Sequence, residues 1–172
     1  MLDLVGADHP HNAWLAAAQG WLHAQRERVA EAERALLRAI DIDDAHLFAR
    51  IELSQILIDG ERFGEAESAL AAALDLQPEN PQLLLFLGDC QLHLDRDAEA
   101  DTTLAKALAT RAAAPVDIAQ IYYQRQRSNR AIEYYQRALH RAPRHPLTLN
   151  NLAWTYAEEG PPPRSLLRPS PQ

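Results

Sequence analysis

The chain has 172 residues, of which 47% are hydrophobic and 24% are charged, and its formal net charge at pH 7 is −7. This composition is typical of one globular domain or one short repeat array, and the negative charge argues against a dedicated nucleic-acid binder. A lone cysteine excludes an internal disulfide framework, and the sequence has no apolar run long enough to predict a membrane span.

One helical pattern recurs along the chain: a small residue, then Leu or Tyr four positions later, then a second small residue after three more. Its copies are Ala32, Leu36 and Ala39; Ala66, Leu70 and Ala73; Ala100, Leu104 and Ala107; and Ala131, Tyr135 and Ala138. Successive copies are separated by 34, 34 and 31 residues. Positions i, i+4 and i+7 share one helix face, so each copy predicts a seam at which a neighbouring helix approaches closely.

In chain order, residues 1–12 are predicted to be an N-terminal arm or the stub of a preceding repeat. The first repeat is predicted over residues 13–46, and two registers fit its first helix. Gly20 in the small-residue position gives a regular step to the second helix, and we favour this register because close helix approach is the stricter requirement. The alternative makes Trp14 and Trp21 the core aromatics and needs two extra residues in the turn.

The second and third repeats are predicted over residues 47–80 and 81–111, and their helix pairs form the best-defined core. The third repeat is shortened, because the fourth copy of the seam arrives three residues early. A fourth repeat is predicted over residues 112–145, where Pro115 suits the first turn of a helix.

Residues 146–160 predict a single helix that caps the array, as an open array needs for solubility. Its inward-facing residues are predicted to be Leu149, Leu152, Ala153 and Tyr156. Residues 161–172 begin with three consecutive prolines, which cannot continue a helix, so this tail is predicted to be disordered.

A period of 34 residues built from paired helices resembles that of tetratricopeptide repeat proteins, and the resemblance covers about residues 10–160. It implies an all-α fold, an α-solenoid of antiparallel helix pairs wound as a right-handed superhelix. The sequence from Asn150 to Trp154 is also similar to that of bacterial members, including some linked to exopolysaccharide and envelope assembly. In this family the first helix of each repeat lines a concave groove that binds proteins.

The resemblance implies that residues beside the seam form the floor of this groove. The predicted peptide-binding residues are Phe48, Ile51, Gln55, Ile58, Asp59, Leu85, Phe86, Asp89, His93, Gln120, Tyr123, Asn150 and Asn151. Other positions on the same floor are Trp14, Ala17, Trp21, Glu52, Leu92, Val116, Asp117 and Trp154. The floor contains no Lys or Arg, so the expected ligand is an apolar or amphipathic segment of a partner protein, with positive charge to meet Asp59 and Asp89.

Two readings of the groove differ from this one. Phe48, Ile51, Leu85 and Phe86 could instead pack against each other or against a domain outside these residues. Co-chaperone members of the family hold a C-terminal carboxylate with Lys, Asn and Arg. The corresponding positions here are Ala17, Trp21, Glu52, Gln82 and Phe86, so that clamp is predicted to be absent.

The sequence predicts no enzyme activity, no metal site and no cofactor. His9 and His11 form a pair without further ligands at metal-site spacing, which favours a solvated terminus. The acidic run Asp41–Asp44 and Glu52 mimic a calcium loop, but His46 occupies the position that requires glycine. Nucleotide-binding, hydrolase and metalloprotease motifs are absent from the sequence.

Charge is divided unevenly along the chain. Residues 1–101 hold 20 acidic and 7 basic residues, and residues 102–172 hold 4 acidic and 10 basic ones. The arginines grouped on the fourth repeat are Arg125, Arg127, Arg130, Arg137, Arg141 and Arg144. A solvated face or a site for an acidic protein is favoured over RNA, because few aromatic residues are left to stack on bases. Complementary ends also predict a possible head-to-tail homo-oligomer.

These features predict a noncatalytic scaffold for protein–protein interaction. The alternatives are a self-assembling structural module, or an arm of a larger bacterial protein of envelope or exopolysaccharide assembly, or of a larger enzyme. The N-terminus lacks the basic start and apolar core of a signal peptide, so the chain as given is expected in the cytoplasm and without membrane contact. If it is a fragment, a periplasmic or envelope location is expected.

Overall fold

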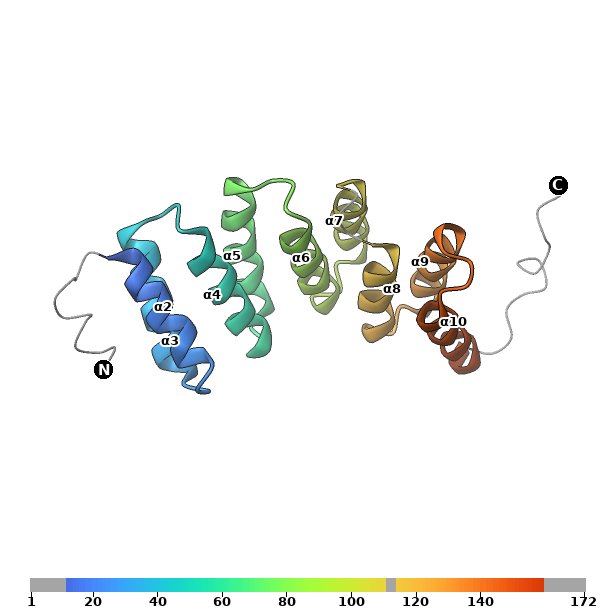
Figure 1. Cartoon of the computed structure of the whole chain (residues 1–172), viewed down its shortest axis with the longest axis horizontal. Helices are drawn as coiled ribbons and strands as arrows, with labels where there is room; N and C mark the ends of the chain where they lie inside the picture. Colours follow the sequence, from blue (N-terminus) through green and yellow to red (C-terminus); the bar gives the residue numbers. More distant parts are fainter. Residues whose placement is uncertain (1–11, 111–113, 160–172) are drawn as a thin grey trace. The chain divides into compact units, whose positions relative to one another are not determined.

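The computed structural model describes residues 12–110 and 114–159, and every regular element in these ranges is an α-helix (Figure 1). The helices are α2 (Ala13–Ala24), α3 (Val29–Ile42), α4 (Leu47–Asp59), α5 (Phe63–Leu76), α6 (Pro81–His93), α7 (Asp97–Ala109), α8 (Pro115–Gln124), α9 (Ser128–Arg141) and α10 (Pro146–Glu159). The predicted all-α fold is confirmed, and the described residues contain the nine predicted helices. The predicted N-terminal arm, except Asn12, and the tail lie outside the described residues.

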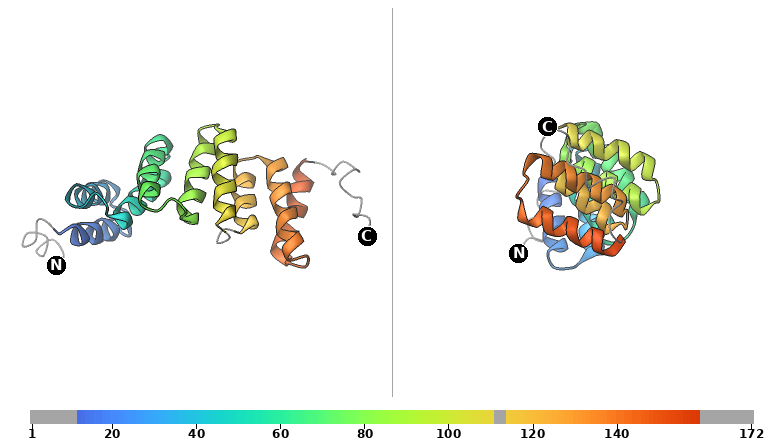
Figure 2. Two further views of the ribbon diagram at one scale, coloured as in Figure 1. Left: turned by 90° about the horizontal axis from the view of Figure 1, so that it is seen from above. Right: turned by 90° about the vertical axis from the view of Figure 1, so that its right-hand side faces the viewer.

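The chain divides into two compact units, Met1–Lys106 and Ala107–Gln172. In the first unit, α2 packs against α3 and α4 against α5, and α3 and α5 in turn contact the helix that follows each of them. In the second unit, α8 packs against α9, and α10 packs against α9 (Figure 2). The two helices of each repeat form an antiparallel pair, as the recurring pattern predicts.

Helices α2 and α6 begin at residues whose side chains satisfy free backbone N–H groups. The Asn12 side chain accepts a hydrogen bond from the backbone N–H of Leu15 at 2.9 Å, and Asn80 accepts from Gln82 and Leu83 at 3.0 and 3.2 Å. These are N-caps of the kind that asparagine favours. The sequence therefore marks the starts of α2 and α6 locally.

The turns within the pairs place a residue other than glycine in the left-handed backbone region. Glu27, Glu61, Asp95 and Gln126 have φ between 56° and 58° and recur at the spacing of the repeats. Gly60, beside Glu61, has a φ of −86°. The backbone N–H of Arg62 donates to the carbonyl of Leu57 at 2.8 Å, which closes the end of α4 as in a Schellman motif.

The predicted seams lie at the centre of the packing. The first three copies are fully buried, and in the fourth Ala131 and Tyr135 are fully buried while Ala138 is half-buried. A Cβ atom built on Gly20 would lie 2.6 Å from Cγ of Leu36, so only glycine allows α2 and α3 this approach. The favoured register is therefore correct, and Trp14 and Trp21 are exposed by 70% and 44% rather than being core residues.

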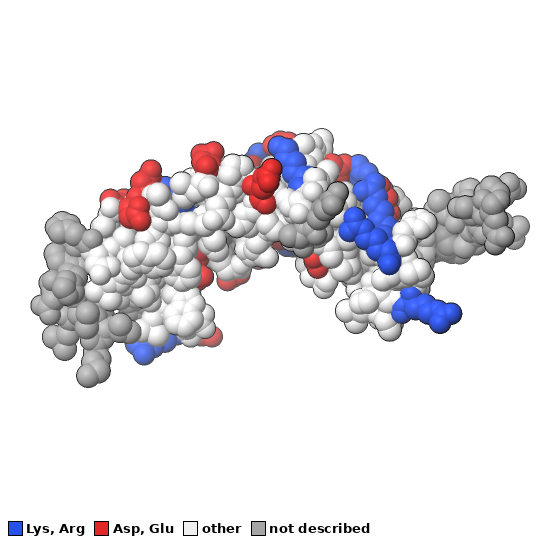
Figure 3. All heavy atoms as spheres, turned by 45° about the horizontal axis from the view of Figure 1, so that its top comes forward, with Lys and Arg blue, Asp and Glu red and all other residues white. Residues whose placement is uncertain are grey.

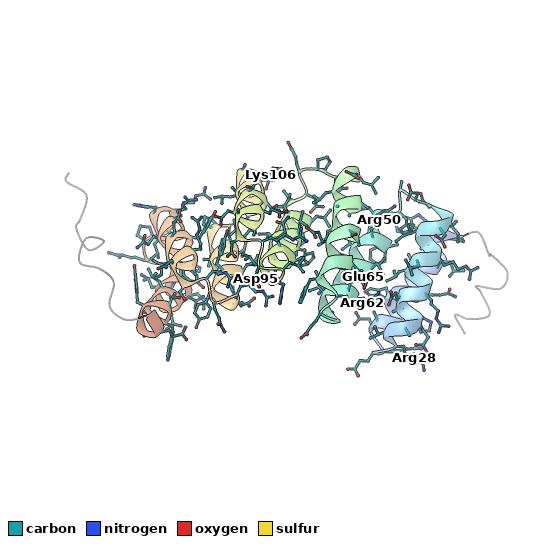
Figure 4. The ribbon with its side chains drawn as sticks, turned by 180° about the vertical axis from the view of Figure 1, so that it is seen from behind. Arg28, Arg50, Arg62, Glu65, Asp95 and Lys106 are labelled. Carbon is teal, nitrogen blue, oxygen red and sulfur yellow. The ribbon has the colours of Figure 1, made fainter. Side chains whose placement is uncertain are left out.

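Ion pairs join successive repeats of the first unit at one repeated position. Arg62 on the turn before α5 binds Glu33 of α3 at 2.7 Å, and Arg96 binds Glu67 of α5 at 2.6 Å. Arg62 also binds Glu65, and Figure 4 shows these two side chains together. Both inter-repeat pairs link residues 29 positions apart. In both pairs the acid lies on a second helix and the arginine lies on the turn that leads into the second helix of the next repeat.

The inward face of α10 differs from the prediction. Thr148 and Thr155 are buried, at 1% and 0% exposure, whereas Leu149 is 45% exposed and Ala153 is also exposed. Leu152 and Tyr156 are half-buried. The predicted residues correspond to the face that a first helix turns toward its own second helix. No second helix follows α10 within the described residues, so only the face that packs on α9 is covered.

Candidate functional site

The predicted groove residues come from four helices in both units. Nine of them lie on α4 and α6 in the first unit, and four lie on α8 and α10 in the second. The first set consists of Phe48, Ile51, Gln55, Ile58, Asp59, Leu85, Phe86, Asp89 and His93. The second set consists of Gln120, Tyr123, Asn150 and Asn151. Each set is a candidate site within its own unit.

The apolar residues of the first set are half-buried. Phe48, Ile51, Ile58 and Phe86 pack against the buried core of the first unit and keep part of their surface exposed. Partial burial fits both predictions for these residues, packing within the protein and contact with a ligand. Any ligand would contact the part that remains exposed.

Side chains on one face of α4 combine apolar and acidic character. Phe48, Glu52, Gln55 and Asp59 follow the i, i+4, i+7, i+11 spacing that places residues on one helix face. The Gln55 side-chain N–H donates to the Asp59 carboxylate at 2.8 Å. Asp59 is therefore already hydrogen-bonded within its own helix, a pairing that the i, i+4 spacing could have indicated.

Glu52 lies between Phe48 and Gln55 and is half-buried. Burial raises the pKa of the Glu52 carboxyl above its ordinary value. No described residue hydrogen-bonds to Glu52 or forms an ion pair with it. The sequence places Glu52 on the floor of the groove, but it predicts that Asp59 and Asp89 meet the positive charge of the ligand. Periodicity does not show which side chains pair within the fold.

The first helices of the first unit are poor in positive charge. Helices α2, α4 and α6 contain one Lys or Arg, Arg50. The Arg50 guanidinium forms an ion pair with Asp44 and donates to the Asp44 backbone carbonyl at 2.7 Å. Arg50 therefore lies bound to the preceding turn and is not available to the acids of α4 and α6. On the face shown in Figure 3, acidic side chains are spread over the first unit.

Two further aromatic contacts belong to the first unit. The His93 ring stacks on Phe63 with ring centroids 3.6 Å apart and an angle of 15° between the planes. His93 is thus packed against the start of α5. Trp14 on α2 lies 4.4 Å from the ring of His46, which is buried, yet Trp14 remains 70% exposed. Trp14 and Trp21, seven residues apart, extend the exposed aromatic surface along α2.

In the second unit the candidate residues are mostly polar. The Tyr123 hydroxyl donates to the Glu158 carboxylate at 2.9 Å, and this hydrogen bond raises the pKa of Tyr123. Gln120 and Asn150 are exposed, Asn151 is half-buried, and Trp154 is 61% exposed. Tyr123 is thus hydrogen-bonded across to α10, and the side chain of Asn151 is hydrogen-bonded to Tyr135. The exposed amides of this set are those of Gln120 and Asn150.

The arginines of the second unit are partly neutralised. Arg130 and Arg137 both bind Glu133, at 3.2 and 2.6 Å, and the Arg137 guanidinium lies 4.8 Å from the centre of the Tyr134 ring. Arg141 and Arg144 are exposed near the end of α9. Fewer arginines of this basic surface lack an acidic neighbour than the six arginines of the fourth repeat suggest.

Within residues 12–110 and 114–159, no cluster of three or more His, Cys, Asp or Glu side chains could hold a metal ion. His9 and His11 lie outside the described residues. None of the described helices has both the length and the apolar character required to cross a bilayer.

Comparison with known proteins gives consistent matches to one family. Two family models, both described as "Tetratricopeptide repeat", match residues 57–121 and 116–165. Comparison with curated protein sequences gives no match.

Solved structures with similar folds include three repeat proteins. YrrB, a "TPR protein with an unusual peptide-binding site", is 17% identical with a TM-score of 0.69, over 92% of this chain and 83% of its own. TTC0263 of Thermus thermophilus is 18% identical with a TM-score of 0.67, over 91% and 87%. PilF of Pseudomonas aeruginosa is 19% identical with a TM-score of 0.66, over 86% and 68%. At these identities the likeness concerns the fold alone.

Proposed function

The chain belongs to the tetratricopeptide repeat family, and we propose that it is a noncatalytic protein-binding module whose first unit binds an amphipathic segment of a partner protein. The proposed binding face is formed by the exposed sides of α2, α4 and α6 and is called here the first-helix face. Its members are Trp14, Trp21, Phe48, Ile51, Glu52, Gln55, Asp59, Leu85, Phe86, Asp89 and His93.

The observation that carries this proposal is the composition of the face. Partly exposed apolar side chains such as Phe48 and Phe86 alternate with the acids Glu52 and Asp89, and the single arginine of the three helices is bound to Asp44. Such a surface offers apolar contact area and negative potential together. An amphipathic helix or extended segment with basic residues matches both properties.

The same residues disfavour a C-terminal carboxylate as the ligand. A carboxylate clamp needs Lys, Arg or Asn side chains as donors. In this chain the positions that match the clamp residues include Glu52, Phe86 and the fully buried Ala17. An internal segment of the partner is therefore the better match. The peptide-binding site of YrrB is one precedent for peptide recognition on this fold.

The proposal is tested by selecting ligands for the full chain from a displayed library of random peptides. We expect enriched peptides to combine apolar and basic residues. Gln55→Arg places a cation on the first-helix face beside Glu52 and Asp59, and should weaken binding of the enriched peptides. Ser68→Arg, an exposed position on α5, is the matched control and should leave binding unchanged. Failure to enrich any peptide, or equal losses in both variants, would reject the first-helix face as the binding surface.

Self-association is a second candidate, favoured by the exposed end of the second unit. Leu147, Leu149 and Trp154 on α10 are exposed by 63%, 45% and 61%. The first unit is acidic and the second carries exposed arginines, so a second copy offers the complementary charge. A head-to-tail contact of this kind is heterologous and forms chains or rings.

A further inference from the structure

The carboxylates that are half-buried in the described residues differ in whether they have a partner. Glu33 and Glu67 bind arginines, and Glu133 binds two. Asp89, Asp97 and Asp101 also interact with other groups. Glu31 and Glu52 are the half-buried carboxylates that interact with no other side chain among the described residues.

The two exceptions have different surroundings. Glu31 lies in the first turn of α3, where free backbone N–H groups and the helix dipole stabilise negative charge. Glu52 lies in the middle of α4, where the backbone N–H groups are used within the helix. A half-buried carboxylate without a partner is unfavourable, since it loses hydration and gains no hydrogen bond in exchange. No residue in the described part of the chain compensates Glu52 for this loss.

We infer that Glu52 selects the charge of the bound segment, by forming an ion pair with a lysine or arginine of the partner protein on the first-helix face. The inference deepens the proposed function and rests on it. Asp59 is already hydrogen-bonded to Gln55, and Asp89 already interacts within the protein. Glu52 is therefore the carboxylate of this face whose hydrogen bonds are all left to a ligand or to water among the described residues.

The neighbours of Glu52 suit a long cationic side chain. Phe48 lies one turn before Glu52 on the same face of α4, and its ring is partly exposed. The aliphatic part of a lysine or arginine can pack along such an apolar surface while its charged end reaches the carboxylate. Aromatic rings also attract cations directly. A cation at Glu52 thus gains both charge pairing and apolar contact.

The burial of Glu52 adds a reason for selectivity. The pKa of its carboxyl is raised by burial, which means that the charged form is short of stabilisation in the free protein. A neutral ligand group that covers Glu52 would displace the water that still hydrates the carboxylate and would not replace it with an opposite charge. An acidic group would add repulsion. Basic segments are thus favoured over neutral and acidic ones of the same apolar pattern.

The test compares peptide selections on the full chain, on Glu52→Gln and on Glu52→Lys, using the same displayed random library. We expect the original chain to enrich Lys and Arg, Glu52→Gln to lose this enrichment, and Glu52→Lys to enrich Asp and Glu instead. Glu79→Lys makes the same charge change at an exposed loop position and is the matched control. It should enrich the same basic peptides as the original chain.

Affinities are then measured by fluorescence anisotropy with one enriched basic peptide and its copy carrying Gln in place of the basic residue. Glu52→Gln should weaken binding of the basic peptide about fivefold and leave the Gln copy unchanged. Circular dichroism of each variant checks that the helices are retained.

The outcomes distinguish a failure of the inference about Glu52 from a failure of the proposed binding function. If basic peptides are enriched equally by all variants, Glu52 does not select charge, although the proposed binding function stands. If the original chain enriches no peptide, the proposed function fails, and this inference fails with it. A reversal of preference in Glu52→Lys alone, with the Glu79→Lys control unchanged, is the result that supports the inference.

Discussion

Gly88 of α6 lies directly against Leu104 of α7: a Cβ atom built on Gly88 would be 2.5 Å from Cδ2 of Leu104 and 2.6 Å from its Cγ. Gly20 and Leu36 have the same relationship in the first helix pair. Leu104 and Leu36 are fully buried, so neither side chain can move aside without disturbing the core. The glycine and the leucine of the seam thus set the distance between the two helices of a pair.

Gly88→Ala should destabilise the protein by about 1–3 kcal/mol, because the added methyl group overpacks the crossing by more than alanine gains in helix propensity. The matched control is Gly64→Ala on α5, where an added Cβ would meet no atom within 4 Å. That change should be neutral or stabilising by up to about 1 kcal/mol. Urea unfolding followed by circular dichroism measures both, and equal effects at the two glycines would contradict the close crossing.

Glu61→Gly should stabilise the protein by about 0.5–1 kcal/mol, because Glu61 has a φ of 57°, a conformation that glycine adopts without steric cost. Gly60→Ala is the neighbouring control: the φ of Gly60 is −86°, outside the left-handed region, and an added Cβ would lie 3.3 Å from the Ile56 carbonyl oxygen, so this change should not stabilise the protein. Thermal unfolding compares the two variants. A loss of stability in Glu61→Gly would mean that the left-handed turn at this residue is wrong.

Glu52→Gln should raise stability at pH 7, and the gain should disappear on acidification. Burial raises the pKa of Glu52 in the folded state, so the folded protein holds this proton more tightly than the unfolded chain does. The ionised carboxyl therefore destabilises the fold at pH values above its raised pKa. This contribution vanishes below about pH 4, where the carboxyl is protonated in both states.

Thermal midpoints of the original chain and of Glu52→Gln, measured across this pH range, check the prediction. Glu79→Gln removes an exposed carboxylate and is the control. A gain from Glu52→Gln that stays constant down to low pH would show that the effect comes from packing rather than from the charge.

Self-association through complementary charges should weaken as salt rises. Exposed charges are screened over a Debye length of about 10 Å at 0.1 M salt, so sedimentation at about 20 mM and about 500 mM sodium chloride brackets this effect. Docking through Leu149 and Trp154 of α10 should instead persist at high salt, because burial of apolar surface does not depend on screening. A monomeric protein at both salt concentrations would reject self-association.

Much of the fold is predictable because it depends on spacing. Ala66 and Leu70 can be assigned to the seam from the recurring pattern, and Gly20 fixes the register of α2 because the neighbouring leucine requires a small residue. The exposure of Leu149 is not predictable in this way. Its burial depends on whether a second helix follows α10, and the pattern within α10 is the same in either case.

The candidate site is less predictable, because its chemistry depends on which side chains already have partners. Phe48 and Phe86 can be placed beside the seam from periodicity, but their partial burial requires coordinates. Asp59 and Glu52 look equivalent in the sequence, as acids on one face of α4. The i, i+4 spacing of Gln55 and Asp59 makes their hydrogen bond a possibility, but the coordinates are needed to show that it forms and that Glu52 has no partner among the described residues.

The most direct test of the proposed binding function is a map of backbone amide chemical shifts in the isotope-labelled full chain, recorded as an enriched basic peptide is added. We expect shifts concentrated at Phe48, Glu52 and Gln55 on α4, together with residues of α2 and α6 on the first-helix face. Exposed positions of α5 such as Ser68 and Ala71 should not change. Shifts confined to α3 and α5, with α4 unchanged, would contradict binding at the first-helix face.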